Sequence, residues 1–379
     1  MSPSTILPGD WAPMFRARTA ANAQYAFHTV AGRYVILSFL GSLGEPAMAQ
    51  AAAHVRERHR AWLDDEHASF FAVSADPADE SEHRLADALP GIRVFWDFDG
   101  AVSRLYGRVG EGAAGKTLRY APQTFVLDPM LRVLAAIPID AAHDARLDAV
   151  IAGLPAVPAH AGVALTAPVL MLPRIFEVDF CRRLIALYET DGGHVSGFMR
   201  DVEGQTRLLH DPRHKKRRDF VVEDEATQQQ IRARLTRRLV PGLANAFQFA
   251  ATRVERYLVA CYEEADRGFF GRHRDNTTKG TAHRRFAVTI NLNAEDHDGG
   301  ELVFPEFGPK TYKPPTGGAV VFSCSLLHEA RPVTRGRRFA FLPFLYDNAA
   351  AQIRAQNRQF VAPRDDAETD ANPSTNVNN

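Results

Sequence analysis

Hydrophobic and polar positions in the first 150 residues alternate between short apolar runs and segments with helical spacing. Two segments, 47–64 and 80–88, place apolar residues at the intervals of an amphipathic helix. The apolar runs that predict strands lie at 34–40, 69–74, 94–96, 123–128 and 133–138. Strands that alternate with helices indicate an α/β sheet domain.

The pattern changes in the second half of the chain. Helical spacing appears first, at 172–188 and at 227–240, where Ile231, Leu235 and Leu239 share one face. Short apolar runs with turn signals between them then dominate, at 253–261, 286–293, 301–304, 319–322 and 338–346. Many short strands beside two helices are typical of an α+β double-stranded β-helix, or jelly roll.

A Pro/Ala/Gly stretch at 153–162 separates the two patterns, and 379 residues suit two domains better than one. We therefore expect one domain at 1–160 and a second at 165–350, followed by an extension at 351–379. From about residue 363 this extension is rich in Asp, Asn and Thr without an apolar pattern, which predicts a disordered tail.

Charge, cysteine content and the lack of long apolar stretches indicate which partners and which cellular compartment suit the chain. Lys and Arg together number 45 and so do Asp and Glu, so net charge favours neither nucleic acid nor a membrane surface as partner. Three cysteines make no disulfide framework and suit a reducing compartment. The opening residues lack a signal-peptide pattern, and no apolar stretch reaches the length of a membrane span. These features predict a cytoplasmic protein.

Candidate metal ligands stand at His273, Asp275 and His328. If 269–275 is a strand, its period of two places His273 and Asp275 on one face. A histidine arriving from another strand would complete a two-His, one-carboxylate set, which leaves metal positions open and is typical of non-haem Fe(II) oxygenases. Arg338 follows His328 by ten residues, after a turn marked by Pro332 and Gly336, and could clamp a carboxylate in the same cavity.

These residues resemble the prolyl 4-hydroxylase type of 2-oxoglutarate/Fe(II)-dependent dioxygenase. The matching motifs are the HxD pair, the Gly299-Gly300 loop before Phe304-Pro305, His328 and the basic residue ten later, over roughly 170 to 347. Many members carry lysine where this chain has Arg338.

The resemblance implies Fe(II) and the co-substrate 2-oxoglutarate, with release of succinate and CO2. It further implies Arg338 and Tyr262 as 2-oxoglutarate contacts. Asn276, next to Asp275, is expected from its position to orient that carboxylate. The implied reaction is hydroxylation of a prolyl or other amino-acid or peptide C–H, with ascorbate sustaining turnover. The substrate itself is not identified by the sequence.

Several of these residues also have simpler interpretations. Tyr262 could cap a sheet with its hydroxyl in water, and Asn276 could only form a turn. His283 and His297 are rival metal ligands, although the Asp/Gly turn around His297 favours a solvated side chain. The basic run at 210–218 is expected to be a solvated loop near the mouth of the site rather than a nucleic-acid patch.

The first domain resembles the peroxiredoxin branch of the thioredoxin fold over roughly residues 5 to 150. Landmarks of that family are similar at 8–15, 97–107 and 122–129. A peroxiredoxin needs a thiolate where the first core strand turns into a helix, yet 41–48 holds no cysteine, and Cys181 is the first in the chain. We expect a non-catalytic domain for substrate or partner contacts, including a homodimer contact.

Two alternatives to the dioxygenase remain at this point. One is a redoxin-type protein of thiol or peroxide metabolism, against which the missing cysteine counts. The other is a non-catalytic binding protein on a jelly-roll scaffold, against which the full set of His273, Asp275, His328 and Arg338 counts.

Overall fold

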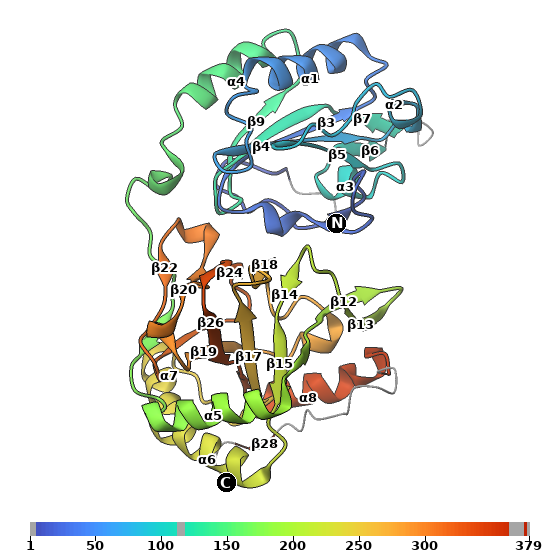
Figure 1. The fold of residues 1–379 in the computed structure, drawn as a ribbon. Coiled ribbons are helices and arrows are strands. Elements are labelled where there is room, and N and C mark those ends of the chain that lie inside the picture. The colour runs from blue at the N-terminus through green and yellow to red at the C-terminus, as the bar shows by residue number, and fades with distance from the viewer. Residues whose placement is uncertain (1–4, 112–117, 364–374, 377–379) are drawn as a thin grey trace. The chain divides into compact units, whose positions relative to one another are not determined.

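The computed structural model describes residues 5–111, 118–363 and 375–376, and the chain divides into two compact units. The first unit contains residues 1–166 with 305–309, and the second contains 167–304 with 310–379. Both units are drawn in Figure 1. Apart from 375–376, the tail expected from about residue 363 lies outside the described residues.

The first unit is a thioredoxin-like α/β fold on a five-stranded sheet of order β5-β4-β3-β8-β9. Strands β3, β4 and β5 are parallel, whereas β8 and β9 run antiparallel. Their bounds are β3 Tyr34–Gly41, β4 Ala68–Ser74, β5 Ile92–Trp96, β8 Gln123–Leu127 and β9 Val133–Pro138. The sequence predicted all five, because strands covered on both faces are continuous apolar runs.

Both faces of this sheet are covered by apolar side chains. On one face Ile36 and its neighbours pack against Val55 of α1 (Pro46–Arg58) and Leu147 of α4 (His143–Ala152). These two helices lie side by side over the sheet in Figure 1. The opposite face carries an aromatic layer in which Phe71 and Phe95 stack with ring centroids 5.0 Å apart.

The helices of the first unit differ from the expected ones. Helix α1 ends at Arg58 rather than near residue 64, and α2 covers only Pro77–Ser81 where a helix over 80–88 was predicted. The chain leaves α2 because His83 adopts a φ of 54°. The sequence did not predict α3 (Ala101–Leu105) or α4. Smaller elements are β1 (Arg16–Ala17), β2 (Tyr25–Ala26), β6 (Val109–Glu111) and β7 (Leu118–Tyr120).

The second unit is a double-stranded β-helix formed by a ten-stranded and a five-stranded sheet. The strands of the larger sheet are β10 Leu170–Leu172, β11 His194–Val195, β15 Arg218–Val221, β16 Arg253–Glu255, β17 Leu258–Glu263, β19 Phe286–Asn291, β23 Ala319–Ser323, β26 Arg337–Phe341, β27 Phe344–Tyr346 and β28 Thr375–Asn376. The smaller sheet contains β14 Lys215–Lys216, β18 Phe269–His273, β21 Leu302–Val303, β22 Thr311–Tyr312 and β24 His328–Ala330. The hairpin of β12 (Phe198–Val202) and β13 (Gln205–Leu209) stands apart from both.

Helices α5 (Val178–Asp191), α6 (Glu225–Arg234) and α7 (Val240–Phe247) support the larger sheet through one core. The predicted face is confirmed, because Ile231, Leu235 and Leu239 are all fully buried. A further helix, α8 (Asn348–Asn357), follows the last core strand and crosses the expected domain end at residue 350. Among the described residues, no helix combines the length and apolar character needed to cross a membrane.

Candidate metal centre

The three candidate ligands converge in the second unit. His273 ends β18 and lies directly opposite His328 at the start of β24, with ring centroids 4.2 Å apart. The Asp275 carboxylate lies between them, its two oxygens 3.5 Å from His273 Nε2 and 3.4 Å from His328 Nε2. The expected strand through residue 275 is too long, because β18 ends at His273. Asp275 instead lies in the turn after β18, where its N–H donates to the Cys324 carbonyl and fixes the position of the carboxylate.

Backbone contacts orient both imidazole rings. His273 Nδ1 contacts the Gly271 carbonyl at 2.8 Å, and His328 Nδ1 contacts the Leu326 carbonyl at 3.0 Å. A ring that donates its Nδ1–H to a carbonyl presents Nε2 as the lone-pair nitrogen, which is the form that binds a metal. Both Nε2 atoms face Asp275, so the donor set is arranged for one ion.

Electrostatics also favour the ligand forms. Burial, together with the neighbouring His328, lowers the pKa of His273 to about 4, which keeps the ring neutral at pH 7. Burial alone would raise the pKa of Asp275, but His328 and His273 outweigh it and hold that pKa below its usual value. Neutral histidine and ionised carboxylate are the forms that coordinate a cation.

Aromatic side chains wall the centre. The Phe270 ring stacks on His273 with centroids 3.6 Å apart, and Phe322 packs edge-on against His328 at 4.6 Å. The stacking gives Phe270 the role of a wall of the site. The rings shield the ligand atoms from bulk water on this side.

The rival histidines are held elsewhere. His283 is buried with its Nε2 2.7 Å from Glu255, which also binds Arg284. His297 was expected to be solvated, and this was wrong: its side chain is 1% exposed, with Nδ1 on the Gly299 carbonyl at 3.1 Å. Neither belongs to the cluster in which His273, Asp275 and His328 ligand atoms all lie within 4.8 Å of one another.

A buried guanidinium lies in the same pocket. Arg338 on β26 pairs in register with Tyr262 on β17, and both side chains line the pocket beside the metal cluster. Arg338 is 3% exposed, and its Nη1 has no hydrogen-bond partner among the described residues. An unpaired buried donor is costly, so this atom is suited to an anionic ligand.

Sequence reasoning missed Arg217. The basic run at 210–218 is a solvated loop only in its first part: 210–214 form a largely exposed turn, but Lys215 in β14 and Arg217 just before β15 are both 7% exposed. Arg217 forms a bidentate pair with Asp219 at 2.6 Å and donates to the Tyr262 hydroxyl at 3.3 Å. The two-residue spacing of Arg217 and Asp219 was the available signal, because residues two apart on a strand share a face.

The remaining predicted contact is Asn276. Its amide donates to Ser325 Oγ at 2.8 Å, and its side chain lies at a partly exposed turn. That bond directs the amide to the loop before β24 rather than to Asp275. Its expected role of orienting the carboxylate therefore stays a prediction.

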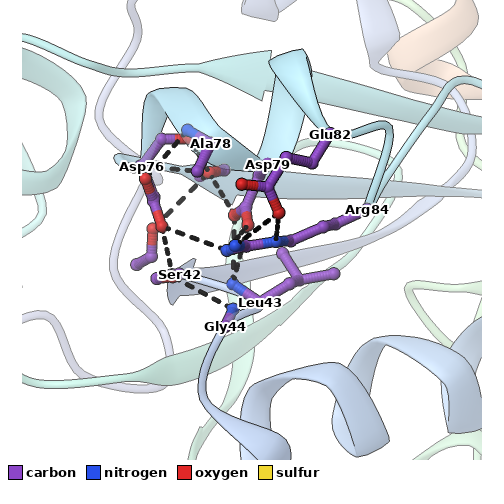
Figure 2. A network of polar contacts seen from close by, with 10 residues as sticks. Ser42, Leu43, Gly44, Asp76, Ala78, Asp79, Glu82 and Arg84 are labelled. Atoms are coloured by element: carbon purple, nitrogen blue, oxygen red, sulfur yellow. Dashed lines mark hydrogen bonds and ion pairs between the residues drawn. The ribbon is translucent and has the colours of Figure 1, made fainter.

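In the first unit, carboxylates hold the turn where a peroxiredoxin needs its thiolate (Figure 2). Asp79 is completely buried and accepts the Leu43 N–H with both oxygens, at 3.1 and 3.0 Å. Ser42 Oγ donates to Asp76 at 2.6 Å, while Arg84 lies 3.4 Å from both aspartates. The backbone and cationic groups of this turn are thus already engaged by carboxylates.

Comparisons with known proteins agree with both units. A model of the 2OG-Fe(II) oxygenase superfamily matches residues 257–346, and a model of the AhpC/TSA family matches residues 8–136. The solved structure of peroxidoxin BcpB from Mycobacterium tuberculosis is 24% identical, with a TM-score of 0.33, and the match covers 39% of this chain and 95% of that one.

Two curated relatives are PKHD-type hydroxylases. The one from Synechococcus sp. (strain JA-2-3B'a(2-13)) is 36% identical over 102 residues, which are 25% of this chain and 45% of the relative. The chain thus spans less than half of that relative's length. The one from Cupriavidus metallidurans is 32% identical over 177 residues, which are 43% of this chain and 70% of the relative. Because the chain covers 70% of that protein at 32% identity, it belongs to the PKHD-type hydroxylases of the 2OG-Fe(II) oxygenase superfamily, and residues 8–136 in front match the AhpC/TSA family.

Proposed function

We propose that this protein is an Fe(II)- and 2-oxoglutarate-dependent dioxygenase that hydroxylates a C–H bond of an amino-acid or peptidyl substrate. The observation that carries the proposal is the convergence of His273 Nε2, His328 Nε2 and the Asp275 carboxylate within 4.8 Å. The buried Arg338 Nη1 in the same pocket, which has no partner among the described residues, supports a dicarboxylate co-substrate.

The residues present fit the metal and the co-substrate. His273, Asp275 and His328 would hold the iron and leave further positions open. With 2-oxoglutarate and O2, Fe(II) supplies oxidative decarboxylation to succinate and CO2 coupled to hydroxylation of a C–H bond. Arg338 would bind the distal carboxylate of 2-oxoglutarate. Arg217 donates to the Tyr262 oxygen, so the Tyr262 O–H is the group proposed to donate to the co-substrate.

The finer parts of the proposal concern substrate and partners. A prolyl residue is one candidate among amino-acid or peptide C–H donors, and ascorbate is proposed to sustain turnover. A homodimer through the first unit is a further proposal, which sedimentation of the full chain would test. The neutral balance of 45 basic and 45 acidic residues supports a small or peptidyl partner over nucleic acid.

The proposal is tested by measuring succinate formed from 2-oxoglutarate by the full chain with Fe(II) and ascorbate. Proline-containing peptides, peptides with alanine in place of proline, and free amino acids would be compared as substrates. Succinate that rises with one substrate class, together with a mass gain of one oxygen in that substrate, is the expected result. Absence of succinate under all conditions, including uncoupled turnover, would contradict the proposal.

Gly300→Ala is expected to weaken 2-oxoglutarate binding. Gly300 has a φ of +73°, and an added Cβ would lie 2.6 Å from Arg338 Cδ, so the guanidinium must shift. We expect the KM for 2-oxoglutarate to rise by about tenfold or more. Separately, alanine at this positive φ should lower the free energy of unfolding by about 1–3 kcal/mol. Gly204→Ala is the matched control, because Gly204 has a φ of +80° with open space around its Cβ position. Equal KM values for the two variants would contradict the contact with Arg338.

The full chain is expected to consume no hydrogen peroxide when a chelator is present and dithiothreitol or thioredoxin is supplied. The turn at 41–48 holds no cysteine, and the three cysteines of the chain are buried and unpaired. Burial raises the pKa of both Cys181 and Cys261 to about 12, which keeps them protonated thiols at pH 7. Rapid thiol-dependent peroxide loss would instead favour the redoxin alternative.

A further inference from the structure

A second histidine–carboxylate cluster lies in the first unit, apart from the candidate iron ligands. His54 on α1 and His59 just after its end both direct Nε2 at one oxygen of Asp148 on α4, each at 2.8 Å. Together with the iron cluster, it is one of the two groups among the described residues whose ligand atoms could hold one ion. Three donors of metal-binding type therefore converge on one point.

A second carboxylate supports the outer side of this cluster. Asp144, one turn before Asp148 on α4, lies 3.7 Å from His54 Nδ1, the nitrogen that does not face the cluster. Asp144 is fixed by His143 Nδ1 at 2.8 Å, and Gln50 donates to it at 3.4 Å. Metal-binding histidines commonly direct their second ring nitrogen to a carboxylate, which orients the ring. At 3.7 Å the Asp144 contact is longer than a hydrogen bond, and a small rotation of His54 would bring Nδ1 within bonding range of it.

The fold makes this convergence rigid. Val55 of α1 and Leu147 of α4 are fully buried in one core, so the helices that carry the donors are fixed against the same sheet face. His143 anchors the start of α4 through Thr124 Oγ1 at 2.9 Å. Small side-chain rotations are then enough to adjust the donors to an ion.

Access and spacing suit a small cation. The side chains of His54, His59 and Asp148 are 20%, 12% and 36% exposed, so an ion can reach them from solvent. Zinc binds histidine nitrogen and carboxylate oxygen at about 2.0–2.2 Å, which puts tetrahedral donors about 3.3 Å apart. The present 2.8 Å contacts need only a small opening. Arg58 lies 4.0 Å from the outer Asp148 oxygen, but its side chain is 70% exposed and free to move outward.

We propose that His54 Nε2, His59 Nε2 and Asp148 form a binding site for a divalent transition metal of the zinc class, with water as the remaining ligand. The ion would join the end of α1 to α4, two helices separated by more than 80 residues of sequence. Its role would be to stabilise the first unit, independently of the iron centre in the second.

The test is zinc stoichiometry of the full chain by equilibrium dialysis against micromolar free Zn²⁺, with bound metal measured by atomic emission. Zinc should also occupy the His273/Asp275/His328 centre, so wild type is expected to bind two equivalents. The double variant His54→Gln/His59→Gln should bind one, because glutamine keeps a donor to Asp148 but is a poor ligand. Asp275→Ala should also bind one, at the new site, with a thermal midpoint raised by zinc.

Matched variants separate this site from a general surface effect. His67→Gln removes another aspartate-paired histidine, 61% exposed and bonded to Asp64 at 2.6 Å, and should still bind two equivalents. Asp148→Asn provides a second loss variant should the double variant fold poorly by circular dichroism. Wild type and both loss variants binding equal amounts of zinc would overturn the site, as would Asp275→Ala binding none. If the His273/Asp275/His328 centre binds no zinc, wild type should still bind one equivalent at the first-unit site and the double variant should bind none.

Discussion

Asp275→Ala is expected to abolish decarboxylation of 2-oxoglutarate, measured as succinate release without added substrate. The carboxylate is the only anionic member of the cluster and faces both histidine Nε2 atoms, at 3.5 and 3.4 Å. Loss of a group that merely orients a ligand costs roughly 10–100-fold, so loss of a ligand should exceed about 100-fold. His273→Ala and His328→Ala should behave alike, because each removes one of three ligands.

The control for the histidine variants is His194→Ala. His194 lies in the same unit with its side chain 78% exposed, and its loss should leave succinate release unchanged. If His328→Ala retained iron affinity and activity, the third ligand would be His283 or His297 instead. The bond from His283 to Glu255 makes that outcome unexpected.

Arg338→Ala is expected to weaken 2-oxoglutarate binding by about 30-fold or more while changing iron affinity little. Removing one partner of a buried, charge-assisted contact costs roughly 2–5 kcal/mol. The side chain is 3% exposed and has a donor without a partner among the described residues, so water is a poor substitute. Arg338→Lys should keep part of the affinity, because the charge remains while the two-pronged geometry is lost.

Arg337→Ala is the matched control for this variant. Arg337 is adjacent in sequence, but its side chain is 47% exposed and pairs with Glu189 at 2.6 Å on the surface. The KM of Arg337→Ala for 2-oxoglutarate should stay at the wild-type value. An unchanged KM in Arg338→Ala, combined with a large rise in Arg217→Ala, would identify Arg217 as the carboxylate-binding group.

The core strands and the metal cluster were predictable because their signals are local. Residues 34–40 and 69–74 are apolar runs that only a buried strand accommodates, and the structure places β3 and β4 there. The HxD spacing and the histidine beyond β23 sufficed to name His273, Asp275 and His328. The position of Asp275 differs from the expected one, because Asp275 follows β18 instead of lying in the strand. Its N–H donates to the Cys324 carbonyl.

Features that depend on distant partners were not predictable. The sequence pattern predicts that Lys215 and Arg217 belong to a solvated basic run. Both are buried because their hydrogen bonds are accepted by Ser196, Tyr262 and Asp219. Such pairing is set by the order of strands in the sheet, which residue patterns do not encode. The early end of the helix expected at 80–88 has a local cause instead, since His83 adopts a φ of 54° and the Arg84 N–H returns to the Asp79 carbonyl.

We propose that one pocket of this chain holds Fe(II) and 2-oxoglutarate together. Anaerobic titration of the full chain with Fe(II) and then 2-oxoglutarate, followed by visible absorption, measures this joint binding. We expect a weak metal-to-ligand charge-transfer band that needs both components and is absent in Asp275→Ala. Arg338→Ala should shift the titration to much higher 2-oxoglutarate concentrations. A wild-type chain that binds Fe(II) but shows no band at saturating 2-oxoglutarate would overturn the shared site.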